Sequence, residues 1–456
     1  MLAQVLFHQG FRYRIDPKNP EQVFKHILSN GGCVRKVHNL YVDYLYNELE
    51  TMGYQGGPVP KIRCPELTVF KKQFPFLKEA DSLGLCNAKI DFENSVKKFN
   101  EAPSREYTKR SRRREKSGGT APTFRDIKGI PKFHCKKDNC YSYTTNSQDT
   151  KNGSCTVRLS GEMLHVPKLK TDIKLILHRP LPEGATIKNV TLSMEPDGAF
   201  YASICVEYAR EVDMTVRQYG LDHDMEAISR LKGIGLDYSQ GHFYADSEGR
   251  TANCPHAYLK ALDKLARLQR DLSRMEKGSK NYEKQLGRIR KLHTKVKNQR
   301  KDFCHKESTR LAREYDFVAV EDIDLRAMSQ GLHLGKKLMD NGFGMFREYL
   351  AYKLERKGSI LVKVDRFFAS SQTCSRCGYK NPEVKDLKVR EWVCPCCGAR
   401  LDRDNNAADN VLAEAYRIFA EYCTAWQKER DETADKAAKL KAGRKKPKST
   451  KKEAAA

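Results

Sequence analysis

Residues 371–410 read SQTCSRCGYKNPEVKDLKVREWVCPCCGARLDRDNNAADN, a stretch that contains two CxxC pairs. Cys374 and Cys377 form the first pair, Cys394 and Cys397 form the second, and sixteen residues lie between the pairs. Four thiolates at this spacing are typical of a closed tetrahedral zinc site with each pair on a tight turn. The sequence therefore predicts a zinc ribbon in which these four cysteines bind Zn²⁺.

An acidic helix start follows the ribbon. The segment DRDNNAADN begins at Asp402, and we expect Asp404 to lie in the first turn of a helix. A carboxylate in that position can point at whatever the end of the helix faces. If Asp404 is part of a metal site, other acidic residues must lie close to it in the fold.

Two predicted strands end in acids of the same kind. In KGIGLDYS the apolar alternation leads to Asp237, and in DFVAVEDIDL the apolar run leads to Glu321. A lone acid at the end of a strand is more often a turn or cap residue, but these two and Asp404 are almost evenly spaced, 84 and 83 residues apart. Such oxygen ligands suit Mg²⁺ or Mn²⁺, and two such ions can support phosphodiester hydrolysis. The sequence thus predicts one carboxylate site.

Composition favours a polyanionic partner. The chain has 456 residues, enough for more than one domain, and carries 84 Lys and Arg against 58 Asp and Glu, a net charge of +26. Fifteen cysteines do not indicate disulfides here, because no signal-peptide pattern opens the chain and four cysteines are better explained as zinc ligands. No apolar run approaches the ~18 residues of a membrane span. We expect a cytoplasmic protein that binds nucleic acid and no membrane.

The positive charge is clustered. Residues 256–315 predict an antiparallel helical hairpin with a narrow apolar seam and basic outer faces, residues 105–116 form a basic loop or helix, and a basic tail begins at Lys436. Each cluster could equally be a solvated face. The candidate phosphate-binding residues are Arg112, Arg113, Arg114, Lys132, Lys136, Lys137, Arg288, Lys291, Lys295 and Arg300.

The remaining chain alternates in character. Residues 1–16 alternate like a strand, and residues 20–50 have helical spacing that we expect to break at Gly31 and Gly32. Residues 124–208 contain short alternating segments separated by turns, which predicts a β-rich module. A polar linker is expected at 210–231.

From Gly233 to Ala413 the sequence resembles the RuvC-like nuclease domain of TnpB, the transposon-associated RNA-guided DNA endonuclease related to compact type V CRISPR effectors. The matching runs are GSKNYEKQLGRIRKLHTKVKNQRKDFCHKESTRLAREYDFVAVEDIDL, GMFREYLAYKLERKG, VDRFFASSQTCSRCGY and REWVCPCCGARLDRDNNAADNVL. Upstream, GIPKFHCKKDNCYSYTT and NVTLSMEPDGAFYASICVEY resemble the β-barrel wedge domain of that family. The likeness extends from Pro131 to Ala413 and fades toward both ends.

The resemblance implies a catalytic triad of Asp237, Glu321 and Asp404 that holds Mg²⁺ or Mn²⁺. Asp402 competes for the third place, and Asp404 is preferred because the family places this acid two residues before the Asn of an NAA turn, here Asn406. Two features depart from the family. DYSQ replaces a DLG-type turn after the first acid, and Cys396 adds a fifth thiol that could exchange with Cys397, although CPxCG geometry argues against exchange.

The resemblance also implies a multidomain α+β architecture: a β-barrel wedge with an inserted helical recognition domain, then an RNase H-like (RuvC) α/β nuclease domain that carries the zinc ribbon. The implied boundaries are wedge strands at 1–19, the helical recognition domain at 20–119, the wedge β-barrel at 120–210, a linker at 211–231, the nuclease domain at 232–366 with its hairpin at 256–315, the zinc ribbon at 367–400, a final helix at 401–426 and a basic disordered tail at 427–456.

The partners implied are a guide RNA and a double-stranded DNA target with a short flanking motif, met in a prokaryotic nucleoid. Oligomeric state, including a homodimer, stays open. Three alternatives remain. The first is a guide-dependent DNA binder or repressor without cleavage, and the second is a transposase or resolvase that acts without RNA. The third is a zinc-ribbon scaffold with no enzymatic activity, which would explain only about forty residues.

Overall fold

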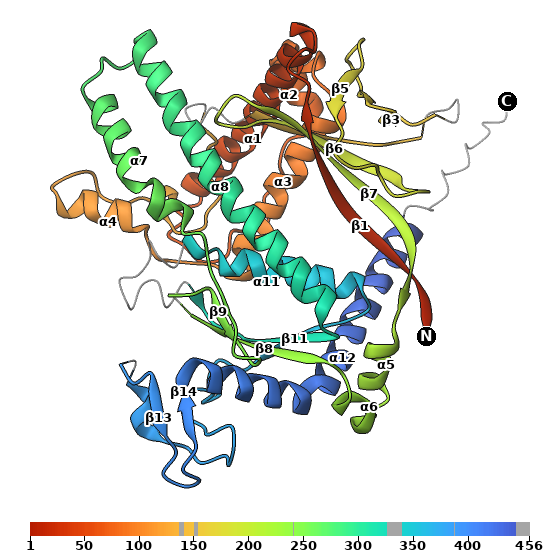
Figure 1. The fold of residues 1–456 in the computed structure, drawn as a ribbon. Helices are drawn as coiled ribbons and strands as arrows, with labels where there is room; N and C mark the ends of the chain where they lie inside the picture. The colour runs from red at the N-terminus through yellow and green to blue at the C-terminus, as the bar shows by residue number, and fades with distance from the viewer. Residues whose placement is uncertain (136–140, 150–153, 240, 326–339, 387, 444–456) are drawn as a thin grey trace. The chain divides into compact units, whose positions relative to one another are not determined.

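The computed structural model describes residues 1–135, 141–149, 154–239, 241–325, 340–386 and 388–443 (Figure 1). By its internal contacts the chain divides into two compact units. One unit is Leu6–Arg210, and the other is Glu211–Ala456 together with Met1–Val5. Each unit is described by itself.

The helical part of the Leu6–Arg210 unit has a core of its own, formed mainly by α1 and α3. The helix α1 continues without a break through Gly31 and Gly32, so the predicted interruption is wrong. A Cβ on Gly31 would lie 3.0 Å from the backbone nitrogen of Ser142, which shows that this glycine permits close packing against β2. The helices are α1 (Glu21–Thr51), α2 (Leu67–Gln73), η1 (Pro75–Lys78), α3 (Ser82–Glu101), α4 (Lys109–Lys116) and η2 (Phe124–Asp126).

The β-rich part of this unit forms a seven-stranded sheet with the order β2-β6-β7-β1-β5-β4-β3. The predicted strand at the start of the chain and the predicted β-rich module are both confirmed as members of this sheet. The strands are β1 (Leu2–Ile15), β2 (Tyr141–Asn146), β3 (Arg158–Ser160), β4 (Met163–His165), β5 (Ile173–Ile176), β6 (Thr186–Met194) and β7 (Phe200–Asp213).

The Glu211–Ala456 unit contains a five-stranded sheet with the order β10-β9-β8-β11-β12. The strands β8, β11 and β12 are parallel to one another. Strand β9 pairs antiparallel with β8, and β10 pairs antiparallel with β9, so β9 alone runs in the opposite direction. Parallel strands that are covered on both faces read as continuous apolar runs, as KGIGL and FVAV do. The strands are β8 (Gly233–Tyr238), β9 (Tyr244–Asp246), β10 (Thr251–Ala252), β11 (Phe317–Glu321) and β12 (Leu361–Val364).

Helices cover both faces of this sheet. One core cluster joins Val318 and Val320 of β11 to α8 and α11, and a second joins Phe317 and Ala319 to α12. The predicted helical hairpin is confirmed as α7 and α8. The helices are α5 (Thr215–Leu221), α6 (Met225–Ser229), α7 (Ala257–Ser273), α8 (Lys280–Glu314), α11 (Phe343–Arg356), η4 (Pro382–Lys385) and α12 (Arg403–Gly443).

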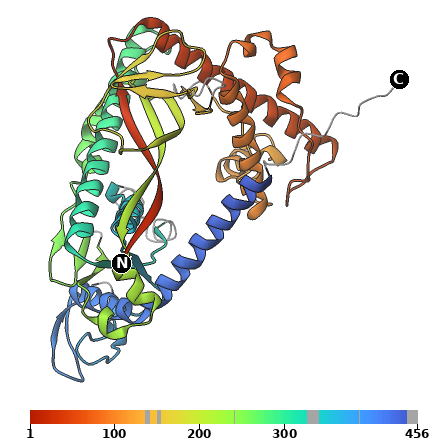
Figure 2. The same ribbon diagram turned by 90° about the vertical axis from the view of Figure 1, so that its right-hand side faces the viewer.

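Two predictions for this unit need correction. The expected linker contains α5 and α6, and Arg217 of α5 is buried, with its guanidinium 3.5 Å from the ring centroid of Trp426 and its Nε donating to the Ser359 carbonyl at 3.0 Å. A polar sequence therefore packs here because its arginine has fixed partners. The final helix does not end at Trp426 but continues to Gly443 (Figure 2).

Among the described residues, no helix is long and apolar enough to cross a membrane.

Candidate active site and zinc ribbon

Asp237 and Glu321 occupy equivalent positions on neighbouring parallel strands. Val320 of β11 pairs with Leu236 of β8, and each acid is the next residue of its strand. Side chains alternate along a strand, so Glu321 shares a face with Phe317 and Ala319, the face that packs against α12. By the same alternation Asp237 lies on that face, opposite the one formed by Leu236. The register therefore places both carboxylates side by side under α12.

Close packing brings the start of α12 to this edge of the sheet. A Cβ on Gly235 would lie 2.2 Å from the Ala408 carbonyl oxygen, so only a glycine allows α12 to approach β8 this closely. Asp404 lies in the first turn of α12, as predicted. Gly235 of the GIGLD sequence therefore allows the start of α12, which carries Asp404, to lie close to Asp237.

The three carboxylates affect one another electrostatically. Burial raises the pKa of Asp237 well above its usual value, the charges of Glu321 and Asp404 raise it further, and nearby Arg403 partly opposes these effects. Burial also raises the pKa of Glu321, while a hydrogen bond from Ser370 lowers it. Carboxylate oxygens are the donors that Mg²⁺ and Mn²⁺ prefer, so the three acids are candidate ligands for such an ion.

The structure distinguishes Asp402 from Asp404. Asp402 is the last residue of β14 (Arg400–Asp402), is exposed, and accepts a hydrogen bond from the Asn405 backbone N–H at 2.9 Å, as an N-cap residue does. Asp404 is half-buried, raises the pKa of Asp237, and lies 3.4 Å from the guanidinium of Arg390. Asp404 therefore joins the carboxylate cluster and Asp402 caps the helix.

Sequence patterns did not single out the residues that support the cluster. The hydroxyl of Ser370 donates to Glu321, and its carbonyl accepts from the Asn410 side chain at 2.7 Å. Asn406 and Asn410 also donate to the Thr373 carbonyl, at 2.7 and 2.6 Å. The only signal in the sequence was the i, i+4 spacing of the two asparagines, which puts them on one face of α12.

The predicted zinc ligands lie together. The sulfur atoms of Cys374, Cys377, Cys394 and Cys397 all lie within 4.8 Å of one another. The Cys374–Cys397 and Cys377–Cys394 sulfurs are 3.7 and 3.6 Å apart. Four ligands at about 2.3 Å from one tetrahedral Zn²⁺ have sulfurs about 3.8 Å apart, so this cluster could bind zinc. Cys396 is exposed and lies outside the cluster.

Local backbone structure forms the two cysteine turns. The N–H of Gly378 donates to the Cys374 carbonyl and that of Gly398 donates to the Cys394 carbonyl, both at 2.9 Å. A small hairpin of β13 (Glu391–Val393) and β14 joins the second turn to α12, and Trp392 lies in its core. The ribbon therefore ends where the helix that carries Asp404 begins.

The predicted phosphate-binding residues differ in their surroundings. Arg112, Arg113, Lys132, Arg288, Lys291 and Lys295 are exposed, and Lys136 and Lys137 lie outside the described residues. Arg114 is exposed but pairs with Asp126 at 3.1 Å. Arg300 is half-buried, and its Nε and Nη2 donate to the carbonyl and the carboxylate of Asp340 at 2.7 and 3.1 Å.

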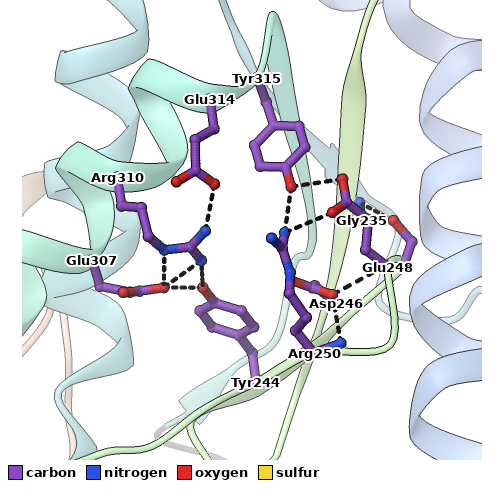
Figure 3. A network of polar contacts seen from close by, with 10 residues as sticks. Gly235, Tyr244, Asp246, Glu248, Arg250, Glu307, Arg310, Glu314 and Tyr315 are labelled. Atoms are coloured by element: carbon purple, nitrogen blue, oxygen red, sulfur yellow. Dashed lines mark hydrogen bonds and ion pairs between the residues drawn. The ribbon is translucent and has the colours of Figure 1, made fainter.

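A second group of acids in this unit has a different character (Figure 3). Arg310 binds Glu307 and Glu314 at 2.7 and 2.6 Å, and Tyr244 donates to Glu307. In the facing half, Arg250 binds Asp246 and Glu248, each at 3.0 Å. Each carboxylate of this group has an arginine partner, so the group ties α8 to β9 and its turn.

Comparisons with known proteins identify the family of the chain. Residues 343–411 match the family described as "Cas12f1-like, TNB domain", and residues 203–331 match the family described as "Probable transposase". A putative RNA-guided DNA endonuclease of Streptomyces pristinaespiralis is 30% identical over 421 residues, which cover 91% of this chain and 90% of the relative. The putative RNA-guided DNA endonuclease InsQ of Escherichia coli (strain K12) is 31% identical over 51% of this chain and 58% of its own length.

Among solved structures, a Cas12f1–sgRNA–target DNA complex aligns with 89% of this chain and 98% of its own at 11% identity and a TM-score of 0.44. The family matches and the sequence relatives define the class as transposon-related, Cas12f1-like proteins. Within that class, the chain belongs to the TnpB-like family of RNA-guided DNA endonucleases.

Proposed function

We propose that this chain is an RNA-guided DNA endonuclease that hydrolyses phosphodiester bonds at one RuvC-like site formed by Asp237, Glu321 and Asp404. The observation that carries the proposal is the convergence of these three acids at one edge of the five-stranded sheet, from β8, β11 and the first turn of α12. The strand order β10-β9-β8-β11-β12, in which β9 alone runs against the other four strands, supports an RNase H-like assignment.

The residues of the site would divide the work. Asp237, Glu321 and Asp404 would hold Mg²⁺ or Mn²⁺, which supplies charge stabilisation of the phosphoryl group and an activated water when bound. Ser370 would restrict the rotation of the Glu321 carboxylate by its hydrogen bond to one oxygen. Arg390 lies 3.4 Å from Asp404 and partly balances its charge.

The rest of the molecule would hold RNA and DNA. We assign the seven-stranded sheet to the wedge, with its boundaries at 1–19 and 120–210, and the helices of 20–119 to the recognition domain. The nuclease domain would span 232–366 and 401–426, with the zinc ribbon at 367–400, and a guide RNA would select a DNA target beside a short flanking motif. The exposed cations Arg112, Arg113, Arg288, Lys291 and Lys295 are the proposed phosphate contacts, whereas Arg300 belongs to the protein framework.

Cleavage of a target plasmid tests the proposal. The protein is expressed with its native flanking DNA, purified with its RNA, and mixed with plasmids that carry or lack the sequence matched by that RNA. We expect Mg²⁺-dependent cutting of the matched plasmid alone. Asp237→Ala, Glu321→Ala and Asp404→Ala should remove cutting and keep RNA-dependent binding, while the matched control Asp402→Ala should still cut.

The same preparation separates the alternatives. A guide-dependent binder without cleavage would retain the target and leave it intact in the wild type. A transposase or resolvase that needs no RNA would keep its DNA recognition after ribonuclease treatment and would carry no RNA through high salt. Either result would overturn the proposed function.

A further inference from the structure

One aromatic side chain near the carboxylate cluster has no role in the proposed chemistry. Phe367 is 87% exposed, more than any other large apolar side chain among the described residues. A single exposed apolar residue is common on protein surfaces, so exposure alone indicates nothing. Phe367 differs from other exposed apolar residues because it lies on a well-fixed turn and because that turn is close to Glu321 in the sheet.

The turn that carries Phe367 is fixed from several sides. The Asp365 side chain accepts the N–H of Phe367 at 2.7 Å, and the Asp365 carbonyl accepts the N–H of Phe368 at 3.0 Å. Arg366 binds Asp322 at 3.2 Å, and the Phe368 ring packs in the core cluster beneath the sheet. Phe368 is therefore partly buried against the core, while the neighbouring Phe367 is exposed to solvent. A ring on such a support would lose little conformational freedom when a ligand covers it.

The same turn lies at the edge of the sheet where the acids lie. Val364, the last residue of β12, pairs with Glu321 of β11, and Phe367 follows three residues later. Three residues after Phe367, the hydroxyl of Ser370 donates to Glu321. A strand of nucleic acid whose phosphate reaches the acids must therefore pass close to this turn.

Aromatic rings bind unpaired bases by stacking, and they do so with little preference for sequence. A nuclease whose target is chosen by RNA pairing needs such a contact, because a base-specific contact beside the cut would restrict the targets. We propose that Phe367 stacks on an unpaired DNA base next to the scissile phosphate and so positions the strand for cleavage. This inference rests on the proposed function.

A fluorescent base analogue reports stacking without any need for cleavage. DNA targets carry 2-aminopurine at successive positions around the cut site, and each is bound by the full RNA-loaded protein in the Asp237→Ala background. We expect quenching at one or two adjacent positions, retained with Phe367→Trp and lost with Phe367→Leu, which keeps an apolar side chain but removes the ring. Quenching of an analogue placed in the guide RNA, and none in DNA, would overturn the assignment.

Cleavage by otherwise wild-type protein provides the second readout. Phe367→Leu should slow cutting by roughly 5- to 100-fold, the range that one base–aromatic stack supplies, while Phe367→Trp stays within about threefold of wild type. Phe76→Leu, a matched change of an exposed phenylalanine in the Leu6–Arg210 unit, should change neither readout.

The remaining outcomes are also decisive. Phe367→Leu with unchanged cutting and unchanged quenching would overturn the inference while the proposed function stands. A lowered melting temperature of this variant would overturn it as well, because it would show that another part of the protein covers the ring. Failure of the wild type to cut, with the quenching pattern intact, would remove the proposed catalysis and leave the stacking contact.

Discussion

Neutralising Asp237 should stabilise the protein in the absence of metal. Asp237 and Glu321 follow paired residues of adjacent parallel strands, so their side chains leave backbones that are about 5 Å apart. Two charges at about 5 Å and an effective dielectric constant of about 20 repel each other by about 3 kcal/mol. Because both side chains are partly exposed, screening lowers this to about 1–3 kcal/mol. Asp237→Asn should recover this free energy at neutral pH.

The effect should depend on pH with a defined sign. Burial and the neighbouring acids raise the pKa of Asp237 in the folded protein above its unfolded value of about 3.9. Below the unfolded pKa both states are protonated, so wild type and Asp237→Asn should be equally stable. As pH rises through the folded pKa, the wild type loses stability that the variant keeps.

Thermal unfolding followed by tryptophan fluorescence measures this difference. Both tryptophans, Trp392 and Trp426, belong to the unit that holds the acids. In a chelator at about pH 8, Asp237→Asn should melt about 2–12 °C above wild type, since 1 kcal/mol shifts the melting temperature of a unit of this size by about 2–4 °C. Asp263→Asn, a change of an exposed acid on α7, is the matched control and should not shift it.

Added Mg²⁺ should narrow the difference. A tenfold excess over its dissociation constant stabilises the wild type by about 1.4 kcal/mol and should leave Asp237→Asn almost unchanged. If the variant without metal melts at or below wild type at this pH, or if Mg²⁺ stabilises both proteins equally, then the acids do not form the repelling cluster that we describe.

Three further predictions use other parts of the same unit. Asp402→Ala should lower the free energy of unfolding by about 1 kcal/mol through loss of the helix cap but leave cleavage intact, and loss of cleavage would contradict the assignment of Asp404. Gly235→Ala should destabilise by about 1–3 kcal/mol and abolish cleavage by pushing α12 from β8, as fluorescence melting and plasmid cutting can show. Zinc analysis should find one ion per chain in wild type and in Cys396→Ser and none in Cys397→Ser, and the reverse pattern would move the ligand from Cys397 to Cys396.

The features predicted correctly are those that depend on residues close together in the sequence. Two CxxC pairs, an apolar seam with helical spacing, and an acid after a run such as FVAV each express a constraint within a few residues of the chain. The four-cysteine cluster, the hairpin α7–α8 and the strands β8 and β11 follow directly from these patterns.

The features missed depend on contacts between distant segments. The polar stretch around Arg217 packs because the Ser359 carbonyl and the Trp426 ring surround its guanidinium, and neither partner is visible locally. In the sequence Arg300 cannot be told apart from the exposed basic residues of the hairpin, but in the structure its guanidinium binds Asp340. Helix α12 continues past Trp426 because Lys, Glu and Ala are good helix formers, a preference that the high charge of the tail concealed.

The position of the ribbon just before α12 follows from the hydrogen bonds between them. Asn406 and Asn410 project from the first turns of α12 and bind the carbonyls of Ser370 and Thr373, the residues that lead into the first cysteine turn. Ser370 in turn holds Glu321. The ribbon is therefore connected to two of the acids. The segment that leads into its first cysteine turn contains Ser370, which binds Glu321, and its last strand, β14, leads directly into the helix that carries Asp404. A structural metal placed here would hold Ser370 against Glu321 and fix the start of the helix that carries Asp404.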